Sequence, residues 1–155
     1  MLRGARGQQQ AQGTKRSWNV VVFFIGGVKL AARTEDVGGV SPWTGTIPVP
    51  SRTPFVQAVL KRDNHVMPVY DLAARLNRTL TGSPLLCLVA RHLDGPMAIC
   101  IDADVPSLET VDAAAIRPNG RGDIESLGSV TIGENEVAIV ALQRLGRSTQ
   151  GTATS

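Results

Sequence analysis

Short apolar runs separated by turn residues fill the chain between residues 17 and 146. The first two runs, residues 19–25 and 28–32, flank Gly26-Gly27, a pair typical of a tight hairpin turn. Strand-length runs with turn signals at short intervals are typical of small β-barrels and sandwiches. The pattern therefore predicts an all-β fold with short helical turns.

The same pattern continues to the end of this region. The further predicted strands cover residues 56–60, 65–70, 85–91, 97–101, 124–127, 130–132 and 136–142. Turns are expected at residues 61–64 and 133–135 and at Asp94-Gly95, because polar residues and glycine gather there. A stretch from Val40 onward reads as extended until four prolines, between residues 42 and 54, exclude a central strand.

Three short helical turns complete the expected elements. Asp71 is a suitable N-cap for residues 72–76, because its carboxylate can accept a backbone N–H of the first turn. Thr34 is expected to cap a turn over residues 34–37, where acidic residues suit the first turn. A third turn is predicted at residues 112–116 and ends before Pro118.

Composition divides the chain into one domain and two tails. Residues 1–16 carry four basic residues and no acid, within a total formal charge of +3 for 155 residues. We predict a disordered basic tail at residues 1–16, a single domain at residues 17–146 and a disordered tail at residues 147–155. Because the basic surplus lies in the tail and only six residues are aromatic, the folded part is poorly suited to binding nucleic acid.

Hydropathy also bears on location. No apolar run approaches the roughly 20 residues that a membrane span needs, and the longest covers only residues 20–25. Residues 1–15 contain no apolar segment of the kind found in secretory signals. We therefore expect a soluble cytoplasmic protein.

Catalytic chemistry finds little support in the sequence. His65 and His92 each flank a predicted turn, which is typical of exposed residues, and nothing supplies a nucleophile with its base and orienting group. Asp102 and Asp104 share a strand face but lack a third metal ligand, so hydrogen bonding at the strand end is the better interpretation. We expect no enzyme activity, no cofactor and no metal site.

The two cysteines lie on neighbouring predicted strands. If Asp94-Gly95 forms a two-residue loop, Cys87 faces Asp102 and Cys100 faces Val89, so the two thiols are diagonal neighbours. Their spacing does not match a zinc site. We expect buried, reduced thiols that pack as small apolar side chains.

The order of these segments resembles the CheW-like domain family over residues 18–145. The family opens with a strand, a glycine turn and a second strand, which correspond to residues 20–32. Residues 60–72 resemble its motif I-N-L-R-G-x-hydrophobic-x-P-hydrophobic-x-D-L and keep Pro68, Asp71 and Leu72. The remaining correspondences are the Ile-Pro at 47–48, the Pro-Phe at 54–55, the Val-Asp-like pair at 101–102, the Ile-x-Pro at 116–118 and the terminal hairpin at 127–142.

Two departures fall on the surface that family members turn toward receptor and kinase. The Arg-Gly pair of the family hairpin falls on Asp63-Asn64, and Arg62 stands one residue early. The acidic residue of the family's Val-x-Glu element falls on Gly39. By resemblance, the protein-binding residues would be Val37, Gly39 and Val40 on the apolar part, with Arg62 and Asp63 at the polar rim.

The resemblance implies two small SH3-like β-barrel subdomains that share a hydrophobic seam. Segments before Leu80 would supply most of the first barrel and segments after Pro84 much of the second. It also implies a non-catalytic adaptor in bacterial chemotaxis or a related chemosensory pathway. Its partners would be the regulatory domain of a CheA-type histidine kinase and a methyl-accepting chemoreceptor-like protein, at receptor arrays on the cytoplasmic side of a membrane.

Two alternatives stay open from the residues themselves. The first is a small β-barrel that binds nucleic acid through the basic N-terminal tail. The second is a hydrolase that uses His65 or His92 with a nearby carboxylate.

Overall fold

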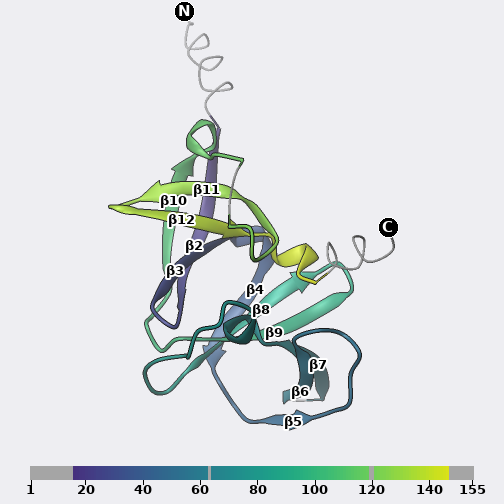
Figure 1. Cartoon of the computed structure of the whole chain (residues 1–155). Helices are drawn as coiled ribbons and strands as arrows, with labels where there is room; N and C mark the ends of the chain where they lie inside the picture. The colour runs from purple at the N-terminus through teal and green to yellow at the C-terminus, as the bar shows by residue number, and fades with distance from the viewer. Residues whose placement is uncertain (1–15, 63, 119–120, 147–155) are drawn as a thin grey trace, which may run out of the picture.

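Two antiparallel-rich β-sheets form the molecule in the computed structural model, which describes residues 16–62, 64–118 and 121–146. The five-stranded sheet lies above the six-stranded sheet in Figure 1. In spatial order the first consists of β10 (Ser107–Asp112), β2 (Ser17–Ile25), β3 (Val28–Arg33), β12 (Asn135–Val140) and β11 (Ser126–Ile132). The second consists of β4 (Val37–Pro42), β8 (Leu86–His92), β9 (Gly95–Ile101), β7 (His65–Tyr70), β6 (Val56–Arg62) and β5 (Thr46–Pro48). The all-β prediction is confirmed.

The allocation of segments to the two sheets agrees with the expected one. The chain leaves the five-stranded sheet after β3, builds the whole six-stranded sheet and then returns with β10. Four of the six strands of the six-stranded sheet precede Leu80, and three of the five strands of the other sheet follow Pro84, as the resemblance implied. The parallel pairings of β3 with β12 and of β7 with β9 add late strands to early ones in each sheet, and no hairpin signal in the sequence connects these strands.

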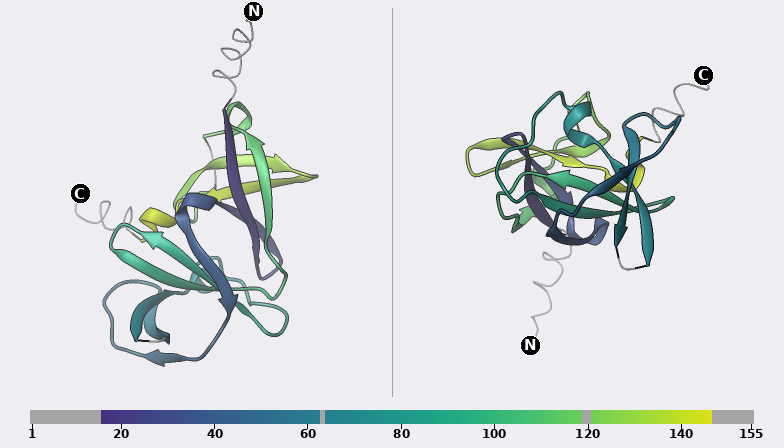
Figure 2. Two further views of the ribbon diagram at one scale, coloured as in Figure 1. Left: turned by 180° about the vertical axis from the view of Figure 1, so that it is seen from behind. Right: turned by 90° about the horizontal axis from the view of Figure 1, so that it is seen from below.

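Both sheets curve back on themselves. An isolated bridge between Arg117, which follows β10, and Ser129 of β11 links the two edges of the five-stranded sheet. In the six-stranded sheet, Arg62 of β6 donates to Ser41 of β4 although β7, β9 and β8 lie between these strands. Figure 2 shows β4, in blue, running from the junction of the two sheets into the six-stranded sheet.

Three apolar clusters fill the structure. One lies inside the five-stranded sheet and consists of Val20, Val22, Ala31, Val111, Val130, Ile132, Val137 and Ile139. A smaller one lies inside the six-stranded sheet and consists of Leu60, Met67, Val69, Cys87 and Ala98. The largest joins the sheets, with Phe23 and Leu30 from one and Leu88 and Ile99 from the other. This shared cluster is the hydrophobic seam, and removing its side chains from water stabilises the joint.

Asp102 holds the joint from the end of β9. Its carboxylate accepts N–H bonds from Gly26 and Gly27 at 2.8 Å and from Thr81 at 2.9 Å, and the residue is 1% exposed. Burial alone would raise the pKa of Asp102, but the backbone N–H groups outweigh that effect and lower it. The predicted strand-end hydrogen bonding is confirmed for Asp102.

The short helical turns agree with the sequence in two cases. Asp71 caps α2 (Leu72–Arg75) by accepting from the Ala74 N–H at 3.0 Å, and Asp112 caps η2 (Ala113–Ala115) by accepting from Ala114. The Thr34 cap is wrong. Arg33 holds the N-cap position of η1 (Thr34–Asp36) without a side-chain bond, while the buried Asp36 accepts from Gln143 at the start of η3 (Leu142–Arg144).

Two strand boundaries also differ from expectation. Residues 124–127 and 130–132 do not form separate strands, because β11 continues through a register shift beside Gly128. The turn after β6 is shorter than predicted, since Arg62 already pairs with His65.

Of the expected N-terminal tail, Arg16 alone falls within the described residues, and its carbonyl oxygen accepts from Ala113. Residues 1–15 and 147–155 lie outside them, so both tails stay predictions.

Candidate functional site

The first three site residues lie on β4, an edge strand of the six-stranded sheet. Val37 is half-buried against the hydrophobic seam, whereas Gly39 and Val40 are exposed. Val40 keeps 39% of its surface accessible. Since β4 pairs with β8 on one side, its other edge presents backbone and side chains outward.

A bulge shapes this edge between Val37 and Gly39. Val37 pairs with Ala90 and Gly39 with Val89, so Gly38 is the extra residue of β4. Gly39 adopts φ +155°, where side-chain-bearing residues are rare, although a Cβ there would meet no atom within 4 Å. Backbone conformation, not lack of space, therefore favours glycine at the position where the family motif has an acid.

Arg62 reaches the same edge from β6. Its guanidinium donates to the Ser41 hydroxyl at 2.5 Å, beside Val40. Burial raises the pKa of the Cys87 thiol, and the nearby Arg62 partly offsets that rise. Arg62 therefore meets β4 at Ser41, whose side chain lies on the opposite face of the strand from that of Val40, and Val37 lies further along β4 toward the seam. Asp63 falls outside the described residues.

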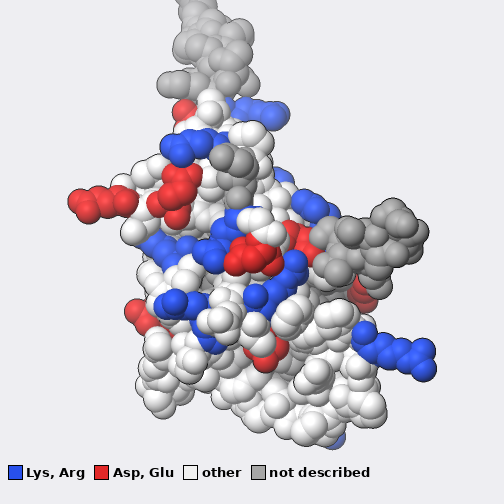
Figure 3. All heavy atoms as spheres, viewed as in Figure 1, with Lys and Arg blue, Asp and Glu red and all other residues white. Residues whose placement is uncertain are grey.

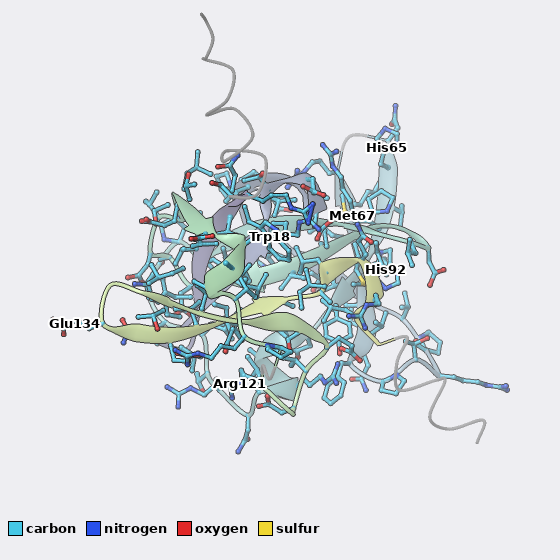
Figure 4. The ribbon with its side chains drawn as sticks, turned by 90° about the horizontal axis from the view of Figure 1, so that it is seen from above. Trp18, His65, Met67, His92, Arg121 and Glu134 are labelled. Carbon is cyan, nitrogen blue, oxygen red and sulfur yellow. The ribbon has the colours of Figure 1, made fainter. Side chains whose placement is uncertain are left out.

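The two histidines do not converge on a site. Figure 4 shows them apart, with His65 at the outer end of β7. The prediction that His92 is exposed is wrong, because its side chain is 6% exposed. Nδ1 of His92 accepts from the Asp94 N–H at 3.1 Å, and Nε2 lies 2.9 Å from the Leu145 carbonyl oxygen. With both ring nitrogens engaged in structural bonds, His92 is poorly placed to act as a general base.

The cysteines are closer than the sequence suggested. The β8–β9 turn consists of Leu93-Asp94, so His92 pairs with Gly95 and Cys87 lies directly opposite Cys100. The expected Asp94-Gly95 loop and the diagonal arrangement of the cysteines are wrong. The two-residue loop lies one position earlier in the chain than the Asp-Gly signal indicated, and this changes the pairing of every residue on β8 and β9. Both cysteines are free, and burial raises the pKa of Cys100 to about 12. They remain neutral thiols at physiological pH.

A comparison with protein-family models matches residues 19–149 to the CheW-like domain. The chain belongs to the CheW-like domain family. This is a family of chemotaxis adaptors and scaffolds that take part in signal transduction.

A solved structure supports the fold independently. The crystal structure of scaffolding protein TtCheW from Thermoanaerobacter tengcongensis is similar to this chain, with a TM-score of 0.73 at 17% sequence identity. The match covers 83% of this chain and 86% of TtCheW. A comparison with curated proteins found no match. Among the described residues, no helix is long and apolar enough to cross a membrane.

Sequence reasoning missed one buried polar cluster in this CheW-like chain. Arg75 of α2 donates to Glu125 at 2.5 Å and to the Tyr70 hydroxyl at 2.7 Å. The Glu125 side chain is 1% exposed and precedes β11 of the other sheet, so the ion pair fastens the two sheets. No local signal connects Arg75 with a carboxylate 50 residues away.

Proposed function

We propose that this CheW-like protein couples a methyl-accepting chemoreceptor-type protein to the regulatory domain of a CheA-type histidine kinase. It would act in the cytoplasm at receptor arrays, as a scaffold without catalytic chemistry. The observation that carries the proposal is the exposed Val40 on the edge strand β4, to which Arg62 of β6 is bound through the neighbouring Ser41. An adaptor needs such a surface, with an apolar centre and a polar rim.

The surface joins groups that are suited to partner choice. Val40 offers exposed apolar area on an edge strand, and Arg62 is tied to the next residue of that strand, Ser41. Charges at the rim of an interface mainly set association rate and partner choice. The departures at Gly39 and Asp63 therefore adapt this chain to its own receptor and kinase, not to partners of a standard Arg-Gly adaptor.

The direct test measures ternary assembly with a chemoreceptor fragment and a CheA-type kinase fragment from the organism that carries this chain. The full chain should bind each fragment and hold both in one complex during size-exclusion chromatography. Val40→Arg should lower affinity for at least one partner about tenfold or more, because it places a charge at the apolar centre. Val105→Arg is a matched control, since Val105 is 82% exposed and lies outside β4.

The rim is tested by a double variant, Asp63→Arg with Asn64→Gly. We expect this variant to shift preference toward the kinase or receptor of a standard Arg-Gly adaptor, measured at two salt concentrations. Equal affinities of wild type and variant for every partner would contradict a role for this turn. Failure of the wild-type chain to bind either fragment would overturn the adaptor proposal itself.

A further inference from the structure

A cavity of about 580 Å³ opens into the interior of the six-stranded sheet. Its inner wall includes Ala58 of β6, Val69 of β7 and Cys100 of β9. A volume of this size is typical of sites that enclose small organic molecules. The cavity lies beyond the β4 edge that the adaptor proposal uses, although Trp43, which follows β4, also lines it.

The cavity results from small side chains at interior positions. Ala58 and Cys100 line the cavity at interior positions of this sheet, where larger residues would fill the space, and the small residues Cys87 and Ala98 are buried beside them. A small barrel whose inward positions carry large side chains is closed by them, whereas small ones leave room for a ligand. The interior is therefore apolar and incompletely filled.

Aromatic rings line the opening. Trp43, Phe55 and Tyr70 all contribute, and the ring centroids of Phe55 and Tyr70 lie 6.1 Å apart. Phe55 adopts φ +64°, a genuine outlier for a bulky residue, and its carbonyl oxygen accepts from the Asp71 N–H at 2.7 Å. Strain of this kind persists where the surrounding structure fixes it, and it gathers at ligand sites.

Asp71 gives the cavity its charge. It is the one charged residue in the lining, and among the described residues no cation forms an ion pair with it. One carboxylate oxygen accepts the capping bond from Ala74, which leaves the other free to accept. Figure 3 shows few charged side chains over the lower part of the molecule, in contrast to the mixed charges above. A carboxylate beside aromatic rings attracts an organic cation.

We propose that this cavity binds a small aromatic molecule that carries a protonated amine. The aromatic part enters among the rings and the small interior residues, and the ammonium group faces Asp71. Burial of the aromatic part supplies apolar contact, while ring faces and the carboxylate select the positive charge. The proposal does not depend on the adaptor function.

Three probes with one ring system test the charge preference. Tryptamine is positive, indole is neutral and indole-3-acetate is negative at pH 7. Isothermal titration with the full chain should show tryptamine binding about three- to tenfold more tightly than indole, with indole-3-acetate weakest. No binding of tryptamine at millimolar concentration, or equal binding of all three probes, would overturn the proposal.

Variants locate the site. Ala58→Leu should fill the cavity and weaken tryptamine binding at least tenfold, and Cys100→Met serves the same purpose if that variant does not fold. Asp71→Asn keeps a capping side chain but removes the charge, so the affinity for tryptamine should fall to the affinity for indole. Asp112→Asn is the matched control, because Asp112 caps η2 in the same way, outside the cavity.

The remaining outcomes either overturn the proposal or assign the cavity to a different ligand. Undiminished tryptamine binding in both filled variants would place the probe elsewhere and overturn the proposal. If a kinase or receptor fragment displaces tryptamine from the wild-type chain, and the filled variants lose that fragment, the cavity accepts a partner side chain instead. Loss of receptor or kinase binding with intact tryptamine binding would contradict only the adaptor function.

Discussion

The interiors of the two sheets are built from different side chains. Seven of the eight buried residues inside the five-stranded sheet are Val or Ile, with Ala31 as the exception. The six-stranded sheet buries Leu60, Met67 and Val69 beside Ala98 and Cys87, and the cavity opens next to them. Branched side chains fill one interior, whereas small ones leave room in the other. Within one CheW-like domain, one interior is thus filled and the other borders a cavity.

The largest effect should come from removing volume in the filled interior. Ile139 is fully buried inside the five-stranded sheet, and Ile139→Ala should cost about 2–5 kcal/mol of unfolding free energy, because it leaves a cavity. Cys100→Ala in the six-stranded sheet should cost less than about 1 kcal/mol, since that side chain already borders open space. Urea unfolding measures both, and equal losses would remove the contrast between the interiors.

Adding volume to each interior should also distinguish the two sheets, because only the six-stranded sheet has space for a larger side chain. Ala31 is fully buried, so Ala31→Leu should destabilise the chain by about 1–3 kcal/mol through overpacking. Ala58→Leu enters the cavity and should leave stability unchanged or raised. The measurement is the urea midpoint of each variant. A large loss in Ala58→Leu would mean that the six-stranded interior has no usable space.

The cap at the mouth of the cavity should have a moderate effect. Asp71→Ala should cost about 0.5–2 kcal/mol, because the Ala74 N–H loses its acceptor. Asp71→Asn should cost less, since asparagine can still cap. Thermal unfolding followed by circular dichroism tests the pair. Receptor and kinase binding by the folded variants should be unchanged, and its selective loss would make Asp71 a partner contact.

The smallest effect should come from Asp102 at the joint between the two interiors, as a change in how stability depends on pH. Folding lowers the pKa of Asp102, so its contribution is present above the unfolded pKa, near 4, and is lost as pH falls through the folded pKa. The melting temperature of Asp102→Asn should therefore fall less than that of the wild type between about pH 5 and pH 2. Parallel curves for both proteins would mean that this carboxylate does not contribute to acid sensitivity.

The sequence determined what nearby residues decide. The glycine pair at 26–27 set the first hairpin, and Asp71 identified the helical turn that it caps, because turns and caps need particular residues within a few positions. The ordered segments also identified the family. Arg62 and Val40 were identified as site residues through that resemblance, but nothing in the local pattern showed that Arg62 would bind β4 at Ser41.

The tertiary structure decided which distant strands pair and what lies between them. The β3–β12 and β7–β9 pairings, the Arg62 bond to Ser41 and the Arg75–Glu125 ion pair all join residues far apart in the chain. The register that sets Cys87 opposite Cys100 depends on where the β8–β9 turn closes. Alternating apolar residues specify that a strand buries one face, but not which other strand will cover it, so the cavity appears only after the sheet has closed.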